Sequence, residues 1–410
     1  MTENQLAKII DNIIPHILLN ENNYKLDWGK EISLELNHVK YSYISYNTAG
    51  KGGKIGKIFE YIENNSVAYC SLDLHSLNLE SKYVIRDISS KWLELQTSIS
   101  QSEWTIILDI LEKIKNRTYE NLPIVLNLIL DPNSVGTVLL TNKHDSKLFD
   151  LLAGSNYTYF VIDKALKIID YKCISWSETS DKKSYSSLPN FLQPFSHLLE
   201  NKIGISLTHS GDIIIYNSAG MIMSERKSNC TIYENSLTKN LYRDVLHPTV
   251  YGIACNLFDI SWDISYRRHG ALIIVTKESS FESHIVNKES IFTSSECIGL
   301  RKELSTSFAN VSLKNTGVIK CRSIFLELSS VDGAVILDGT DGSIKAFGSI
   351  VETAASVSGT SGARSTAAKS ASTYNNMLPI KISSDGDITL YKKAHDTTSC
   401  SDIILEFNFY

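Results

Sequence analysis

Residues 331–351 have the sequence VDGAVILDGTDGSIKAFGSIV, which decides the fold of the C-terminal part of the chain. An apolar run ends at Asp338, and the turn residues Gly339-Thr-Asp-Gly342 separate it from a second apolar run, a pattern typical of two strands joined by a turn. The step Asp332-Gly333 stands at the start of the first strand. By itself this step indicates a plain β-turn, so its meaning depends on the neighbouring segments.

Two further segments carry glycine together with basic and hydroxyl residues. Residues 267–275 have the sequence RRHGALIIV, a junction from helix to strand, and residues 361–370 have the sequence SGARSTAAKS. Glycine allows close backbone approach, the exposed N–H groups of a helix start favour phosphate, and Arg364 could clamp phosphate oxygens bidentately. The alternatives are a solvated arginine and, because residues 353–372 are rich in Ser, Ala, Gly and Thr, a linker.

Taken in order, the motifs GALI, DGA and Gly-Ala-Arg resemble the diadenylate cyclase (DAC) domain superfamily. The resemblance covers roughly the last third of the chain, and it points to the branch in which a sensor domain precedes the DAC domain. It implies an α/β fold with a mixed sheet flanked by helices. It also implies a nucleotidyltransferase that condenses two ATP into the second messenger cyclic di-AMP with release of pyrophosphate.

The resemblance implies a role for individual residues of these motifs. Asp332 would be the catalytic residue, binding a Mg2+ or Mn2+ ion and helping to activate the attacking 3′-hydroxyl. The residues that would bind the nucleotide are Gly270, Ala271, Leu272, Gly333, Ala334, Gly362, Ala363, Arg364, Ser365, Thr366 and Lys369.

The chain departs from the family pattern in the third motif. Many DAC enzymes have Arg-His-Arg where this chain has Arg364-Ser365-Thr366. Many relatives also have a glutamate shortly after this motif, which is not evident here, and Thr373 falls near its place. Lys369, or the pair Arg267 and Arg268, could supply the missing charge. The sequence therefore leaves two functions open, a diadenylate cyclase or a catalytically degenerate DAC domain that senses a nucleotide. A different cyclic dinucleotide as product also stays open.

Composition and charge exclude several other classes of protein. The net charge of -5 argues against a nucleic-acid partner, which normally selects a basic surface. The seven cysteines are scattered singly, which argues against zinc and favours reduced thiols in the cytosol. The chain shows neither a signal peptide nor an uninterrupted apolar run of about 18 residues, so we expect a cytoplasmic protein without a membrane span.

The remaining sequence predicts a mixed α/β domain over residues 1–245, ahead of a DAC-like domain over residues 246–410. Periodicity predicts helices at 5–19, 104–114 and 248–264. It predicts short strands between 32 and 74, buried strands at 123–130 and 135–140, and further strands at 157–162, 166–175, 203–207, 213–216 and 271–275. We expect a surface loop at 177–187. The glycine-lysine stretch at 50–57 is not a P-loop, and it indicates either a basic hairpin turn or an anion site.

Assembly follows from the expected reaction. If each protomer holds one ATP, two DAC domains must meet face to face before either 3′-hydroxyl reaches the α-phosphate of the other nucleotide. We therefore expect a homo-oligomer regulated by the sensor-like N-terminal domain.

Overall fold

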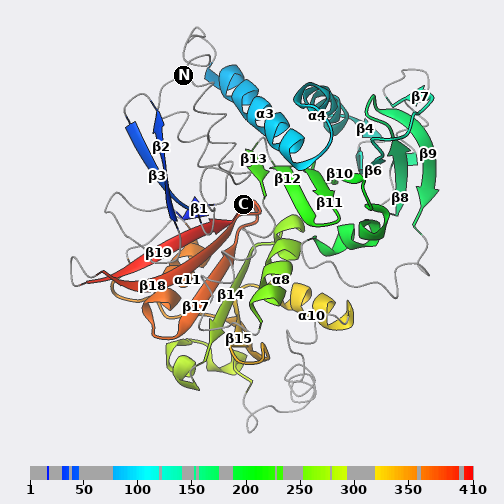
Figure 1. The fold of residues 1–410 in the computed structure, drawn as a ribbon. Helices are drawn as coiled ribbons and strands as arrows, with labels where there is room; N and C mark the ends of the chain where they lie inside the picture. The colour runs from blue at the N-terminus through cyan, green and yellow to red at the C-terminus, as the bar shows by residue number, and fades with distance from the viewer. Residues whose placement is uncertain are drawn as a thin grey trace. The chain divides into compact units, whose positions relative to one another are not determined.

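A computed structural model describes residues 16–17, 30–36, 39–45, 77–119, 122–140, 152–153, 157–174, 188–226, 229–233, 253–277, 279–292, 319–357, 362–396 and 401–409. These residues form two compact units (Figure 1). The first contains the described residues from 30 to 233, and the second contains 16–17 and the described residues from 253 onward. The boundary expected near residue 245 lies outside the described residues.

The first unit is built on an eight-stranded mixed sheet (Figure 1). Its strand order is β13 (Asn229–Ile232), β12 (Gly220–Arg226), β11 (Ile213–Asn217), β10 (Ile203–Leu207), β6 (Leu126–Leu130), β8 (Thr158–Ile162), β9 (Lys167–Cys173) and β7 (Val138–Leu139). Only the β6–β8 pair is parallel among these neighbours. Smaller elements are the hairpin β2 (Lys30–Leu36) and β3 (Val39–Ser45), the pair β4 (Thr118–Tyr119) and β5 (Leu122–Pro123), and the 3-10 helix η2 (Asn190–Leu198).

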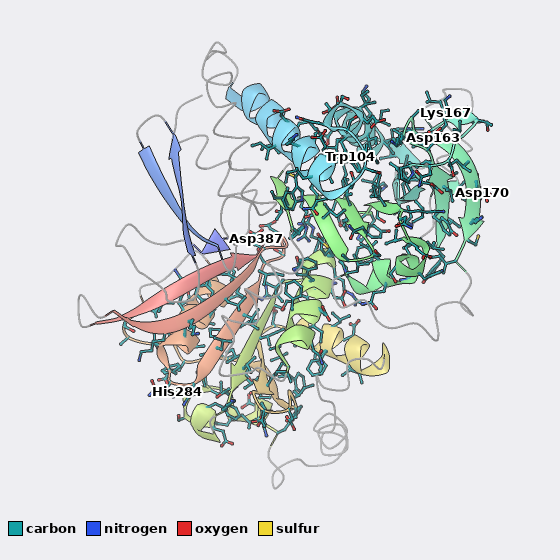
Figure 2. All side chains as sticks on the ribbon, in the orientation of Figure 1. Trp104, Asp163, Lys167, Asp170, His284 and Asp387 are labelled. Carbon is teal, nitrogen blue, oxygen red and sulfur yellow. The ribbon has the colours of Figure 1, made fainter. Side chains whose placement is uncertain are left out.

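Two helices, α3 (Leu77–Gln96) and α4 (Gln101–Lys115), complete the core of this unit. Helix α4 begins with a capping box in which Ser100 and Glu103 each accept from the other's backbone N–H. Its apolar residues recur at helical spacing, and Trp104 is fully buried (Figure 2). Trp92 of α3 donates its indole N–H to the carbonyl of Ile222 at 2.9 Å, which fixes α3 on strand β12.

The second unit is a seven-stranded mixed sheet with helices packed on it (Figure 1). Its strand order is β1 (His16–Ile17), β19 (Ser401–Phe409), β18 (Ile388–Asp396), β17 (Met377–Ile382), β14 (Ala271–Thr276), β15 (Ala334–Asp338) and β16 (Ile344–Ser349). The helices are α8 (Ala254–Tyr266), α10 (Ile319–Ser329) and α11 (Ala363–Thr373), with 3-10 helices η3 (Ser279–His284) and η4 (Lys288–Ser290).

Strand β14 lies near the centre of this sheet, parallel to β15 and antiparallel to β17. All six of its residues are buried. Because successive side chains of a strand point to opposite faces, both faces of the sheet are covered here. Leu272 and Ile274 share their core with Ala368 and Ala371 of helix α11, so α11 covers that face. The expected α/β fold, a mixed sheet flanked by helices, is confirmed.

Several predicted elements are confirmed, among them helix α4, the β10–β11 hairpin, and strands β14 to β16. The alternative reading of 353–372 as a linker is wrong, because residues 363–373 form helix α11. The expected surface loop at 177–187 and the stretch at 50–57 lie outside the described residues.

Two expectations differ from the structure for physical reasons. The helix expected over 5–19 is wrong at its end, because His16 and Ile17 pair as a strand with β19. Strand β7 is exposed rather than buried, since Val138 and Leu139 form the edge of their sheet. Helix α3 was not expected. None of the helices in the described part of the chain has the length and apolarity needed to span a bilayer.

Candidate functional site

The second unit contains a cleft of about 820 Å³ that is lined mainly by three parts of the chain. These parts are the start of strand β15, the first turn of helix α11, and the end of strand β17 with the turn that follows it. The described residues that line the cleft are 272, 332–333, 349–351, 353, 362–367 and 381–384. Its volume lies within the range of about 300–1,000 Å³ that is common for small-molecule sites.

The floor of the cleft depends on the glycine of the Asp332-Gly333 step. Gly333 has a φ of +103°, and a Cβ atom there would lie 2.4 Å from the carbonyl carbon of Gly348. Only glycine combines this backbone conformation with so close an approach. The two backbones therefore meet at the start of strand β15, and the preceding Asp332 side chain is left fully exposed at the cleft.

Arg364 of the third sequence motif contacts residues of the other two motifs. Its Nη2 atom lies 3.2 Å from Oδ1 of Asp332, and its side chain is 38% exposed. A Cβ atom at Gly270 would lie 2.5 Å from Nη1 of Arg364, so that glycine leaves room for the guanidinium group. The residues of the GALI, DGA and Gly-Ala-Arg motifs thus lie together, although Arg364 and Asp332 are 32 positions apart in the sequence.

Helix α11 begins directly at the cleft. Gly362 precedes it with a φ of +115° and accepts the first helical hydrogen bond, from the N–H of Thr366 at 3.1 Å. Apart from its chain neighbours, no described residue has an atom within 4 Å of the position that a Cβ of Gly362 would take, so the backbone is open to the cleft. The first N–H groups of a helix have no acceptor within the helix, which makes this end suited to an anion.

The comparisons with known proteins identify this region. Residues 261–395, one-third of the chain, match the family DAC, described as "DisA bacterial checkpoint controller nucleotide-binding". These residues form a DAC domain. The match spans the cleft and all three motifs.

Solved structures add little to this assignment. A hypothetical membrane spanning protein from Bacillus cereus is 19% identical, with 42% of this chain and 72% of that chain covered and a TM-score of 0.25. A double mutant of DacA from Staphylococcus aureus is 23% identical, with 33% and 77% covered and a TM-score of 0.21. Likeness at these TM-scores does not bear on the fold. No curated protein is significantly similar to the chain.

Eight of the predicted site residues line the cleft of the DAC domain: Leu272, Asp332, Gly333, Gly362, Ala363, Arg364, Ser365 and Thr366. The others lie beside it. Ala271 and Ala334 are fully buried in their strands, and Gly270 packs against Arg364. Lys369 lies over the ring of Tyr391, with Nζ 6.0 Å from the centroid.

The other candidates for the missing charge have partners of their own. Arg267 forms an ion pair with Glu327 at 3.5 Å, and Arg268 donates to the backbone carbonyl of Asp385. The hydroxyl of Thr373 donates to the carbonyl of Ser370 at 2.7 Å, within helix α11. None of these residues is among those that line the cleft.

One wall of the cleft, formed by residues 349–351 and 353, was not predicted. Side chains from outside the cleft bind the backbone of this segment. The side-chain amide of Asn287 donates to the carbonyl of Gly348 at 2.9 Å and accepts from the N–H of Ile350 at 2.7 Å. The hydroxyl of Tyr374 donates to the carbonyl of Glu352 at 3.1 Å, and its ring stacks on His284. Burial and then the Glu352 carboxylate raise the pKa of Tyr374, so its hydroxyl stays a donor.

The residues fit a divalent cation of the Mg2+ type that works together with a nucleotide. Asp332 is the only acid among the described residues that line the cleft. No group of three or more His, Cys, Asp or Glu side chains that could enclose a metal occurs in the described parts of the chain. Mg2+ is commonly held by one or two carboxylates, with substrate phosphates and waters as the remaining ligands. The single exposed carboxylate of this cleft suits that arrangement.

Proposed function

We propose that this protein is a diadenylate cyclase whose DAC domain condenses two ATP into cyclic di-AMP. The observation that carries the proposal is the pair Asp332 and Arg364, 3.2 Å apart in a cleft that belongs to a DAC domain. In the reaction each 3′-oxygen forms a bond to the α-phosphorus of the other ATP. The bond from that phosphorus to the pyrophosphate breaks, and each 3′-hydroxyl loses its proton.

Asp332 and Arg364 would have different roles in this reaction. A Mg2+ or Mn2+ ion, when bound, would neutralise charge on the phosphates, and Asp332 would hold it. Arg364 would bind phosphate oxygens through its fork of N–H groups. Because Arg364 and Asp332 are paired with each other, nucleotide binding would exchange this exposed ion pair for contacts with phosphate and metal. Exposed pairs of this kind are weak, so the exchange costs little.

Assembly is part of the proposed active site. One cleft would hold one ATP, so each product needs two DAC domains face to face. We propose that the first unit, the sensor-like domain ahead of the DAC domain, regulates this encounter.

A second function, a nucleotide sensor without catalysis, is favoured by one feature. The motif Arg364-Ser365-Thr366 replaces Arg-His-Arg and so lacks one arginine and one imidazole. Phosphoryl transfer depends largely on positioning and on cationic stabilisation, and hydroxyl groups replace only part of that charge. A domain of this kind would bind one ATP and release no pyrophosphate.

An assay over a range of protein concentrations separates the two functions. Purified full-length protein is incubated with ATP and Mn2+ or Mg2+, cyclic di-AMP is detected by mass spectrometry, and pyrophosphate is measured in parallel. For a cyclase we expect both products in the ratio of one to two, with a rate per protomer that rises with protein concentration. Tight ATP binding by calorimetry, without product at any concentration, would favour the sensor.

A further inference from the structure

Lys381 lies on the wall of the cleft where strand β17 ends. It pairs in register with Leu272 of the central strand β14, which also lines the cleft. Paired residues of neighbouring strands point to the same face. Leu272 shares its core with helix α11, so Lys381 lies on the face that α11 covers, beside the first turn of that helix.

The position of this lysine is unusual for its strand. Strand β17 has the sequence MLPIKI, and every residue except Lys381 is buried. A long apolar side chain such as methionine would suit the same place in the strand without placing a charge there. The ammonium group therefore adds little to the packing of the sheet.

Among the described residues that line the cleft, no carboxylate pairs with the ammonium group of Lys381. Its Nζ atom lies 3.3 Å from the hydroxyl oxygen of Ser365, a neutral group in the first turn of α11. Asp332, the only acid among the described cleft residues, pairs with Arg364. With two cations and one carboxylate, the described lining has a net charge of +1, which suits an anionic ligand.

We propose that Lys381 is a phosphate-binding residue of the nucleotide site and supplies part of the cationic charge that Arg364-Ser365-Thr366 lacks relative to Arg-His-Arg. The inference rests on the proposed function, because it takes the ligand to be a nucleoside triphosphate. A lysine acts as a flexible point charge, so Nζ can leave the Ser365 hydroxyl for a phosphate oxygen nearby. Lys369, Arg267 and Arg268 lie outside the cleft lining, which leaves Lys381 as its second cation among the described residues.

Calorimetric titration of ATP into the full-length protein tests this role with three variants. Lys381→Met removes the charge and keeps the length of the side chain, and Lys381→Arg restores the charge. Lys393→Met is the matched control, because Lys393 lies at the other end of α11 with Nζ 3.4 Å from the carbonyl of Thr373. We expect Lys381→Met to weaken ATP binding by about 10- to 100-fold. Lys381→Arg should recover most of the affinity, and Lys393→Met should bind like the wild type.

Salt dependence and thermal unfolding separate a phosphate contact from a structural effect. A lost charge contact makes ATP affinity less sensitive to ionic strength, so the salt dependence should be shallower for Lys381→Met than for the wild type. The unfolding midpoints without ligand should agree. Equal ATP affinity of Lys381→Met and wild type would overturn this inference alone, as would a loss that Lys381→Arg does not restore. Absence of ATP binding by the wild type would overturn the proposed function as well.

Discussion

Replacement of Gly333 by alanine tests whether close backbone approach shapes the cleft. An alanine Cβ at this position would lie 2.4 Å from the carbonyl carbon and 2.7 Å from the carbonyl oxygen of Gly348. Ordinary contacts of a Cβ begin near 3.4 Å, so the two backbones would have to part by about 1 Å. Because both obstructing atoms belong to the backbone, no side-chain rotation relieves the overlap.

Two contributions determine how much the Gly333→Ala substitution destabilises the folded state. The φ of +103° strains any residue with a side chain by about 1–3 kcal/mol, and overpacking adds about 1–3 kcal/mol. Gly362→Ala is the matched control, since Gly362 has a φ of +115° but, among the described residues beyond its chain neighbours, no atom within 4 Å of its Cβ position. We therefore expect the stability of the folded state to fall by about 2–6 kcal/mol in Gly333→Ala and by about 1–3 kcal/mol in Gly362→Ala.

Hydrogen exchange followed by mass spectrometry measures this difference in the full-length protein. Peptides from strands β15 and β16 report the local opening free energy, and peptides from the β10–β11 hairpin serve as an internal reference. Each 1.4 kcal/mol corresponds to about tenfold faster exchange. The difference of about 1–3 kcal/mol between the variants predicts that β15 and β16 exchange about 5- to 140-fold faster in Gly333→Ala than in Gly362→Ala. Equal exchange in the two variants would refute the account of the cleft floor.

The remaining predictions concern charge and thiol chemistry. Arg364→Ala should weaken ATP binding, measured by calorimetry, more than Thr366→Ala does. A hydrogen bond to a charged group contributes about 1.5–3 kcal/mol, whereas a neutral hydrogen bond contributes about 0.5–1.5 kcal/mol. A larger effect of Thr366→Ala would contradict this assignment. At pH 8 iodoacetamide should alkylate the exposed Cys173 and spare Cys230 in the folded protein, since burial raises the pKa of Cys230 from 9.0 to about 12. The same pKa shift gives a stabilisation that is complete below pH 9 and is lost as the pH rises towards 12, so urea denaturation should show falling stability across that window.

Local sequence signals predicted the elements that carry the cleft, because each begins or ends at a recognisable residue. The Asp332-Gly333 step and Gly362 mark backbone conformations with positive φ, and the apolar runs between them have the lengths of strands. The approach of Gly270 to Arg364 could be expected only from the order of the motifs, since these residues are distant in sequence.

The residues that prediction missed depend on register and on distant contacts. Lys381 reaches the cleft because strand β17 pairs with β14 in one register, and a shift by one residue would turn its side chain to the opposite face. Asn287 holds a wall that lies more than 60 positions away in sequence. Helix α3 is a different case, because Ile85, Ile88 and Trp92 recur at helical spacing and the signal was available.

Product formation by Asp332→Asn is the most direct test of the central claim that this cleft makes cyclic di-AMP. The amide keeps the size of the side chain and removes the charge that would hold the metal. Asp341→Asn is the matched control, since Asp341 is an exposed acid outside the cleft that accepts from the N–H of Ser343, a bond that an amide oxygen can keep. With ATP and Mn2+, mass spectrometry should find cyclic di-AMP from the wild type and from Asp341→Asn, and none from Asp332→Asn at an unchanged unfolding midpoint. Cyclic di-AMP formed by Asp332→Asn at the wild-type rate would contradict the account.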